Sequence, residues 1–163
     1  MDGESNARRP KALNTASQLC GLLHATSAKV IGRWDRVLRQ YGIDFAGYAA
    51  LLAVYERWPV GENNLSMRLQ FDPYTFEDAL SDLERCRLIT RSDGDGGVAD
   101  RLVEPSRKAI DLQPDLLEIA EQLSCDFDFA EAEALQLITQ LKRLSLAVTD
   151  SGLSRMAGER ASA

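Results

Sequence analysis

The chain has few of the residues on which metal centres and many active sites depend. One histidine, His24, occurs in 163 residues, and the three cysteines, Cys20, Cys86 and Cys125, are far apart with no Cys-x-x-Cys pair. Multi-histidine metal sites, most histidine-based catalysis and a disulfide scaffold are therefore not expected. The sequence also lacks a glycine loop with a lysine for phosphate, and its acidic pairs have no convergent base or metal framework. We expect a protein that is not an enzyme and that needs no cofactor.

Long apolar runs are also missing. No segment approaches the roughly 20 apolar residues of a membrane span, and the polar start, MDGESNARRP, has no secretory apolar core. With 45% hydrophobic and 27% charged residues, the composition is that of a soluble globular protein. The free cysteines favour a reducing compartment, so the sequence predicts a cytoplasmic protein without membrane contact.

Apolar residues at helical spacing dominate both ends of the chain. Residues 12–41 carry one apolar stripe, and residues 106–150 hold two further helices, the last one at about 130–148. The flanking segments 1–11 and 151–163 are polar and are predicted to be disordered tails. The stripes exceed what a small domain between them can cover, so we expect the two helical regions to form a homodimer interface.

Residues 43–104 are predicted to form a winged helix-turn-helix. Asp44 is placed to cap one helix, which Trp58-Pro59 ends, and a short helix follows within 61–71. Asp72 followed by Pro73 is a strong signal for the start of the next helix. Two short β-prone runs around the turn SDGDGG then predict a hairpin. The expected fold is all-α with a small two-stranded β-wing.

The charge of this central region is unusual for a surface that binds DNA. Between Asp72 and Glu104 there are nine carboxylates and four arginines, so a net −5 of the chain's −6 lies where phosphate contacts are expected. Phosphate neutralisation normally supplies most non-specific affinity for DNA. The basic and helix-start residues that remain as candidate DNA contacts are Arg68, Pro73, Tyr74, Thr75, Arg91 and Arg101.

Three segments resemble the MarR family of regulators, and in particular its organic-hydroperoxide-sensing (OhrR-like) branch. They are QLCGLLHATS (18–27), GIDFAGYAALLAVYE (42–56) and LQFDPYTFEDALSDLERCRLITR (69–91). The first is similar to the branch's Gln-Leu-Cys-x-x-Leu-Tyr-x-x-Ser opening, and the third to a recognition helix that ends in Gly-Leu-Ile-x-Arg. The resemblance covers about residues 13–150 and implies a dimeric DNA-binding regulator.

The resemblance also implies roles for two cysteines and a pocket. Cys20 matches the peroxide-reactive cysteine, and Cys125 stands near the place of a resolving cysteine that the other subunit donates. The family holds its reactive cysteine with tyrosine hydroxyls, but the matching positions here are His24, Trp34 and Phe45. Trp34 can donate one hydrogen bond and Phe45 none, whereas a protonated His24 would stabilise a thiolate.

Two functions stay open from the sequence. The first is a MarR/OhrR-like transcriptional regulator that binds duplex DNA through residues 73–83 and the wing at 92–101, and that senses organic hydroperoxides through cysteine oxidation. The second is a dimeric protein of the same fold that has lost DNA binding and acts through a small ligand or another protein. The acidic recognition segment favours the second, and the motifs favour the first.

Overall fold

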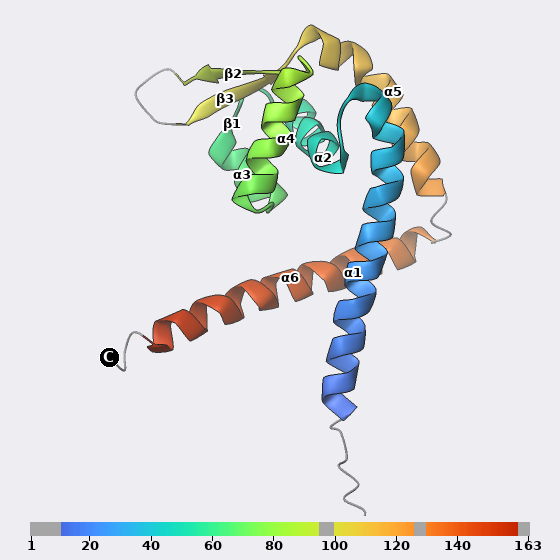
Figure 1. Cartoon of the computed structure of the whole chain (residues 1–163), viewed down its shortest axis with the longest axis vertical. Coiled ribbons are helices and arrows are strands. Elements are labelled where there is room, and N and C mark those ends of the chain that lie inside the picture. The colour runs from blue at the N-terminus through green and yellow to red at the C-terminus, as the bar shows by residue number, and fades with distance from the viewer. Residues whose placement is uncertain (1–10, 95–99, 126–129, 160–163) are drawn as a thin grey trace, which may run out of the picture. The chain divides into compact units, whose positions relative to one another are not determined.

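The computed structural model describes residues 11–94, 100–125 and 130–159. Residues 1–120 form one compact unit and residues 121–163 a second. The elements are α1 (Lys11–Leu38), the 3-10 turn η1 (Arg39–Tyr41), α2 (Phe45–Glu56), β1 (Val60–Gly61), α3 (Glu62–Leu69), α4 (Pro73–Arg85), β2 (Ile89–Asp93), β3 (Arg101–Pro105), α5 (Arg107–Cys125) and α6 (Glu131–Glu159) (Figure 1).

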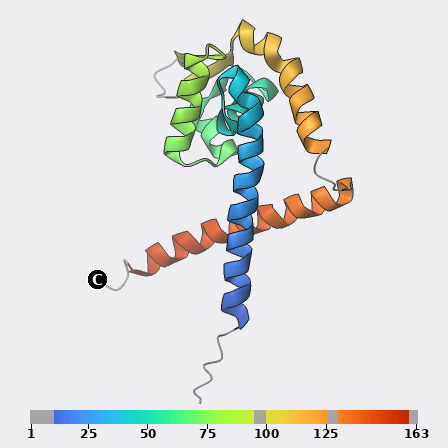
Figure 2. The same cartoon turned by 45° about the vertical axis from the view of Figure 1, so that its right-hand side comes forward.

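Helix α2 lies at the centre of the first unit. The Asp44 side chain caps it as predicted, accepting a hydrogen bond from the Gly47 N–H at 2.8 Å. Its buried side chains, Tyr48, Leu51 and Val54, contact neighbouring elements on several sides. α3, α4 and the strands pack around this helix (Figures 1 and 2). The side chains that complete this core are Trp34, Leu38, Leu65, Phe76, Leu80, Leu83, Leu88, Ile89 and Val103.

A hydrogen bond ties α2 to the start of α5. The Tyr55 hydroxyl donates a hydrogen bond of 2.5 Å to the backbone carbonyl of Ala109. Burial raises the pKa of Tyr55 to about 12, so the hydroxyl keeps its proton and remains a donor across the physiological range.

The predicted hairpin is confirmed, but the sheet has one more strand than expected. β2 and β3 pair antiparallel from Ile89↔Pro105 to Asp93↔Arg101. The short β1 adds to the other edge of β3, which gives the order β1-β3-β2. Two residues are too few to show strand periodicity in a sequence, so no strand was predicted here, and Gly61 was assigned to the segment of the short helix. Part of the predicted turn SDGDGG, from residue 95 on, lies outside the described residues, as do residues 98 and 99.

The long helices at the two ends of the chain agree with the prediction except where α6 ends. α1 and η1 together cover the helix predicted at 12–41, and α5 and α6 cover the two predicted at 106–150. The prediction of an irregular tail from Ser151 is wrong, because α6 continues to Glu159. The segment contains no proline, and its polar composition does not by itself end a helix. The predicted tail at the other end lies almost wholly in residues 1–10, which are outside the described residues.

Candidate nucleic-acid interface

The turn between α3 and α4 is defined by two capping interactions. Gln70 ends α3 in the left-handed region with φ 53°, and its N–H donates to the Ser66 carbonyl at 3.0 Å. The Asp72 carboxylate then accepts from the N–H groups of Tyr74 and Thr75 at 3.1 and 3.0 Å, with Pro73 in the first turn. This is the predicted helix start, and it fixes the direction in which α4 leaves the turn.

Of the three residues predicted to contact DNA at the start of α4, one belongs to the helix cap and two are exposed. The Thr75 hydroxyl donates to Asp72 at 2.5 Å and completes the cap. This hydrogen bond is the main reason that the pKa of Asp72 is lowered from its ordinary value. Pro73 and Tyr74 point outward, and Tyr74 is 84% exposed, which is rare for an aromatic side chain. Tyr74 is therefore the prominent feature of this surface.

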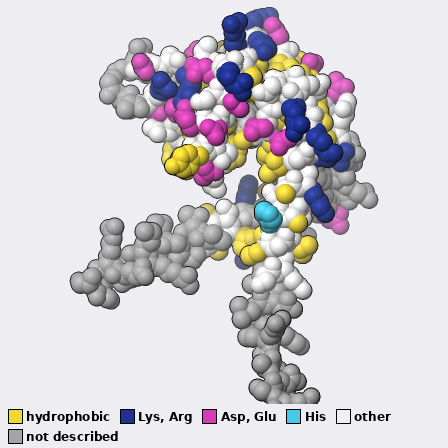
Figure 3. Space-filling model, in the orientation of Figure 1, with side chains coloured by type: hydrophobic (Ala, Val, Ile, Leu, Met, Phe, Trp, Pro, Cys, Tyr) yellow, Lys and Arg dark blue, Asp and Glu magenta, His cyan; other side chains and the backbone are white. Residues whose placement is uncertain are grey.

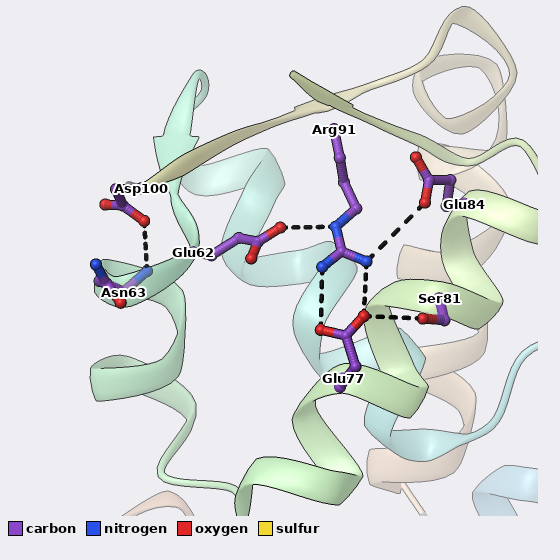
Figure 4. Close-up of polar contacts among 7 residues, drawn as sticks. All are labelled: Glu62, Asn63, Glu77, Ser81, Glu84, Arg91 and Asp100. Atoms are coloured by element: carbon purple, nitrogen blue, oxygen red, sulfur yellow. Dashed lines mark hydrogen bonds and ion pairs between the residues drawn. The ribbon is translucent and has the colours of Figure 1, made fainter. Parts of the chain in front are cut away.

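Arg91, a predicted DNA contact, is held inside the protein by acidic side chains. Its side chain is only 5% exposed and lies inside a ring of carboxylates. Nε donates to Glu62 at 2.6 Å, while Nη1 and Nη2 donate to Glu77 at 2.9 and 3.0 Å. The Glu84 carboxylate lies 3.9 Å from Nη1 (Figure 4). Strand alternation turns Arg91 inward, on the side of β2 that buries Ile89.

We call Arg91, Glu62, Glu77 and Glu84 the arginine clamp. It joins three elements, because Glu62 begins α3, Glu77 and Glu84 lie on α4, and Arg91 lies on β2. The hydrogen bonds and charge of Glu77 and Glu62 raise the pKa of Arg91, and Arg91 in turn lowers the pKa of Glu77. The clamp thus fixes the hairpin against the helix-turn-helix. The sequence contained all four residues, but nothing in it indicated that they meet.

The other predicted arginines have acidic neighbours as well. Arg68 forms an ion pair with Glu56 and donates to the Ala53 carbonyl at 3.3 Å, with 37% of its side chain exposed. Arg101 is exposed on β3, directly opposite Asp93 in the hairpin register. Both side chains reach solvent.

Several carboxylates of this region lie beside an arginine. Glu77, Glu62 and Glu84 face Arg91, and Asp82 pairs with Arg85 at 2.8 Å. Acidic and basic side chains are interspersed over α4 and the hairpin in Figure 3. This pairing leaves the net charge of the region unchanged, and it decides which carboxylates have a cation beside them.

Asp100 has a structural role that the sequence did not reveal. Its carboxylate accepts from the Asn63 N–H at 3.0 Å and so caps the N-terminus of α3 from the far strand of the hairpin (Figure 4). A Cβ atom at Gly61 would lie 2.2 Å from this carboxylate. A side chain at position 61 would therefore displace the Asp100 carboxylate from its place beside the Asn63 N–H.

The predicted redox residues fall into two groups. Cys20 and His24 are both exposed on α1, one helical turn apart. Trp34 and Phe45 pack edge-on with ring centroids 5.7 Å apart, and Tyr48 stacks on Trp34 at 4.8 Å. Trp34 lies roughly 21 Å along the helix from Cys20 at 1.5 Å per residue. Within α1, Cys20 therefore lies far from the aromatic cluster.

The remaining site predictions concern Cys125, metals and membranes. Cys125 is the last residue of α5, and its side chain lies outside the described part of the structure. Among the described residues, no group of three or more histidine, cysteine or acidic side chains is arranged to hold a metal ion. In the same residues, no helix is long and apolar enough to cross a membrane.

Comparison with known proteins identifies the architecture. No protein-family model matches the chain. The HTH-type transcriptional regulator SarZ of Staphylococcus haemolyticus is 24% identical over 129 residues, which are 79% of this chain and 88% of SarZ. Reduced AbfR bound to DNA superposes with a TM-score of 0.73 at 18% identity, over 85% of this chain and 97% of AbfR. MepR of S. aureus bound to DNA gives 0.69 at 20% identity, over 78% and 96%.

Several similar structures are MarR regulators by name, and they match almost their whole length to this chain. Two of them superpose with TM-scores of 0.69 and 0.59, at 16% and 20% identity. By its fold, this chain is a winged helix protein of the MarR type.

Proposed function

We propose that this protein is a dimeric DNA-binding transcriptional regulator. The observation that carries the proposal is the outward face of α4. The helix is fixed in place by the cap at its start and by the arginine clamp. The exposed side chains of this face have no role in the core. Recognition helices in helix-turn-helix proteins present such a face to the major groove. SarZ is a transcriptional regulator, and AbfR and MepR have been solved bound to DNA, which supports the same role here.

The dimer rests on apolar surface that one chain leaves uncovered. In α1, Leu19 and Leu22 are 47% and 66% exposed. The exposed apolar side chains of α6 are Leu135, Leu137, Ile138, Leu141, Leu144 and Leu146. Soluble proteins rarely expose so much contiguous apolar surface. We expect these helices to bury it against a second copy over more than roughly 2,000 Å². A monodisperse 18 kDa monomer in sedimentation equilibrium at micromolar concentration would exclude this assembly.

The proposed binding to DNA is tested with the duplex that lies upstream of the protein's own gene. Fluorescence anisotropy compares wild type with Tyr74→Ala at the start of α4. The matched control is Tyr41→Ala, which removes the same kind of side chain from η1, outside the helix-turn-helix. We expect Tyr74→Ala to weaken binding about tenfold or more and Tyr41→Ala to leave it within a factor of about two. Equal affinities for wild type and Tyr74→Ala would exclude α4 as the DNA-reading element.

We further propose that Cys20 senses organic hydroperoxides. The Cys20 thiolate attacks the peroxide oxygen, the O–O bond breaks, an alcohol leaves, and the sulfur becomes a sulfenic acid. The Cys125 thiol of a second copy then attacks that sulfur, water leaves, and a disulfide joins the two chains. The exposure of Cys20 on α1 supports this role. So do the reduced and overoxidized forms of AbfR, both solved bound to DNA, because they associate this fold with oxidation.

A second candidate function is favoured by the charge of the reading surface. Asp78, Asp93 and Asp100 are on or beside the elements that would face phosphates, and Arg91 is withdrawn into the clamp. A dimer with this surface that does not bind duplex DNA would act through a small ligand or another protein. Absence of any retarded complex with upstream duplex at about 50 mM salt, where phosphate contacts are strongest, would select this alternative.

A further inference from the structure

The exposed and buried residues of α4 occupy opposite faces of the helix. Phe76, Ala79, Leu80 and Leu83 are buried and form the core-facing stripe. At 3.6 residues per turn, Tyr74, Asp78, Ser81 and Arg85 lie within about 60° of one another and centre on the opposite side. All four of these residues are exposed. We call them the reading stripe, because this is the part of α4 that a major groove would meet.

The flanks of the reading stripe are occupied by contacts within the protein. On one side, Glu77 and Glu84 turn toward Arg91 in the arginine clamp (Figure 4). On the other side, Asp82 binds Arg85, which withdraws the guanidinium at the end of the stripe. In the described part of the chain, no ion pair holds Asp78. Tyr74 and Asp78 are therefore the free groups in the first two turns, where base contacts are usually made.

The chemistry of these two side chains selects particular base edges. A carboxylate is only an acceptor, so it can accept from the exocyclic N4 amino group of cytosine but repels the acceptors O6 and N7 of guanine. Tyr74 offers an aromatic surface, and Met67, near the end of the preceding helix α3, is 70% exposed. Apolar side chains recognise the C5 methyl group of thymine. The commonest specific contact, arginine to guanine, has no counterpart in these turns of α4.

We propose that α4 recognises pyrimidines in its DNA half-site. Asp78 accepts a hydrogen bond from a cytosine N4 amino group, and Tyr74 packs on a thymine methyl group. The inference rests on the proposed DNA-binding function and adds the class of base that each side chain reads. It also gives the acidic residue a role in specificity, since an acid at this position costs phosphate affinity and is useful only where it contacts a donor on a base.

Selection from a random duplex library tests the assignment. Wild type should enrich half-sites that contain thymine and cytosine on the contacted strand. Asp78→Asn is the sharper variant, because asparagine pairs with N6 and N7 of adenine, so the selected cytosine should change to adenine. Replacing the selected thymine by uracil, which lacks the methyl group, should weaken wild type about tenfold and Tyr74→Ala by less than about twofold. Asp115→Asn on α5 removes one charge elsewhere and should select the wild-type sequence.

The possible outcomes separate this inference from the proposed function. If wild type enriches no sequence and binds no duplex, both fail. If wild type enriches a half-site but Asp78→Asn selects the same base and only binds more tightly, then Asp78 acts by charge alone, and the assignment to cytosine fails while DNA binding stands. A half-site whose contacted base is guanine would also overturn it. If the change from thymine to uracil weakens Tyr74→Ala as much as it weakens wild type, the assignment to thymine fails.

Discussion

Arg91 donates two parallel hydrogen bonds to Glu77, from Nη1 at 2.9 Å and from Nη2 at 3.0 Å. This bidentate pair connects the hairpin to the middle of α4 across 14 positions of sequence. Because Nε is simultaneously bound by Glu62 of α3, the orientation of the hairpin is tied to both helices of the helix-turn-helix. Arg91 was predicted to bind DNA, and in the structure it positions the hairpin against α3 and α4.

Removing the guanidinium should destabilise the fold. Arg91→Met keeps most of the side-chain volume but leaves Glu62, which is 17% exposed, without its cation. We expect a loss of about 2 kcal/mol in the free energy of unfolding, which is less than for a fully buried pair because Glu77 and Glu84 remain half-exposed. Urea unfolding at one fixed protein concentration measures it. Arg101→Met in the same hairpin is the control and should change stability by less than about 0.5 kcal/mol.

The clamp should also contribute to acid sensitivity. Arg91 lowers the pKa of Glu77 below its ordinary 4.5, so below that pH the unfolded chain binds more protons than the folded one. The stabilisation is therefore complete above about pH 4.5 and is lost as the pH falls through the folded-state pKa. Glu77→Gln should unfold less steeply with acid than wild type between about pH 5 and pH 3 in a series of urea titrations. Steepness equal to wild type would show that Glu77 is not held by Arg91 in solution.

A substitution at Gly61 should act through Asp100. The new methyl group would occupy the place of the carboxylate, so the side chain of Asp100 would leave the Asn63 N–H and α3 would lose its cap. We expect Gly61→Ala and Asp100→Ala each to cost about 1 kcal/mol in thermal or urea unfolding. Because both remove one contact, the double variant should cost little more than either single one. Strict additivity would mean that the two residues act separately.

Oxidation should join two chains through two particular cysteines. An equimolar organic hydroperoxide is expected to give a dimer-sized band on non-reducing gels, and Cys20→Ser and Cys125→Ser should each abolish it. Cys86→Ser is the matched control and should keep the band, because Cys86 is half-buried with its Sγ 3.2 Å from the Gly42 carbonyl. A band that persists in either of the first two variants would exclude the two-cysteine mechanism.

The parts of the fold that depend on local signals were predictable from the sequence. Asp44 and the pair Asp72-Pro73 determine where α2 and α4 begin, because the caps involve residues within three positions of each other. Apolar spacing indicated the long helices for the same reason. The short β1 was missed because it exists only through pairing with β3.

The candidate interface was less predictable because its contacts join residues far apart in sequence. Glu62 and Arg91, or Asn63 and Asp100, are paired by the packing of the hairpin on α3, which no spacing rule indicates. The sequence therefore presented Arg91 as a free cation and Glu77 as a free acid. Tyr74 was recognised as a surface residue from its place after the helix start, and it is exposed.

One measurement tests the proposed DNA binding most directly: anisotropy titration of the upstream duplex and a scrambled version of it across a range of salt concentrations. Four phosphate contacts per subunit would give a log–log slope of about −7 for a dimer. With few free cations at the reading surface, we expect a much shallower slope, a clear preference for the upstream duplex, and affinity for the scrambled duplex weaker than about micromolar at about 150 mM salt. Equal affinity for both duplexes, or a slope of about −7 or steeper, would contradict this description of the protein.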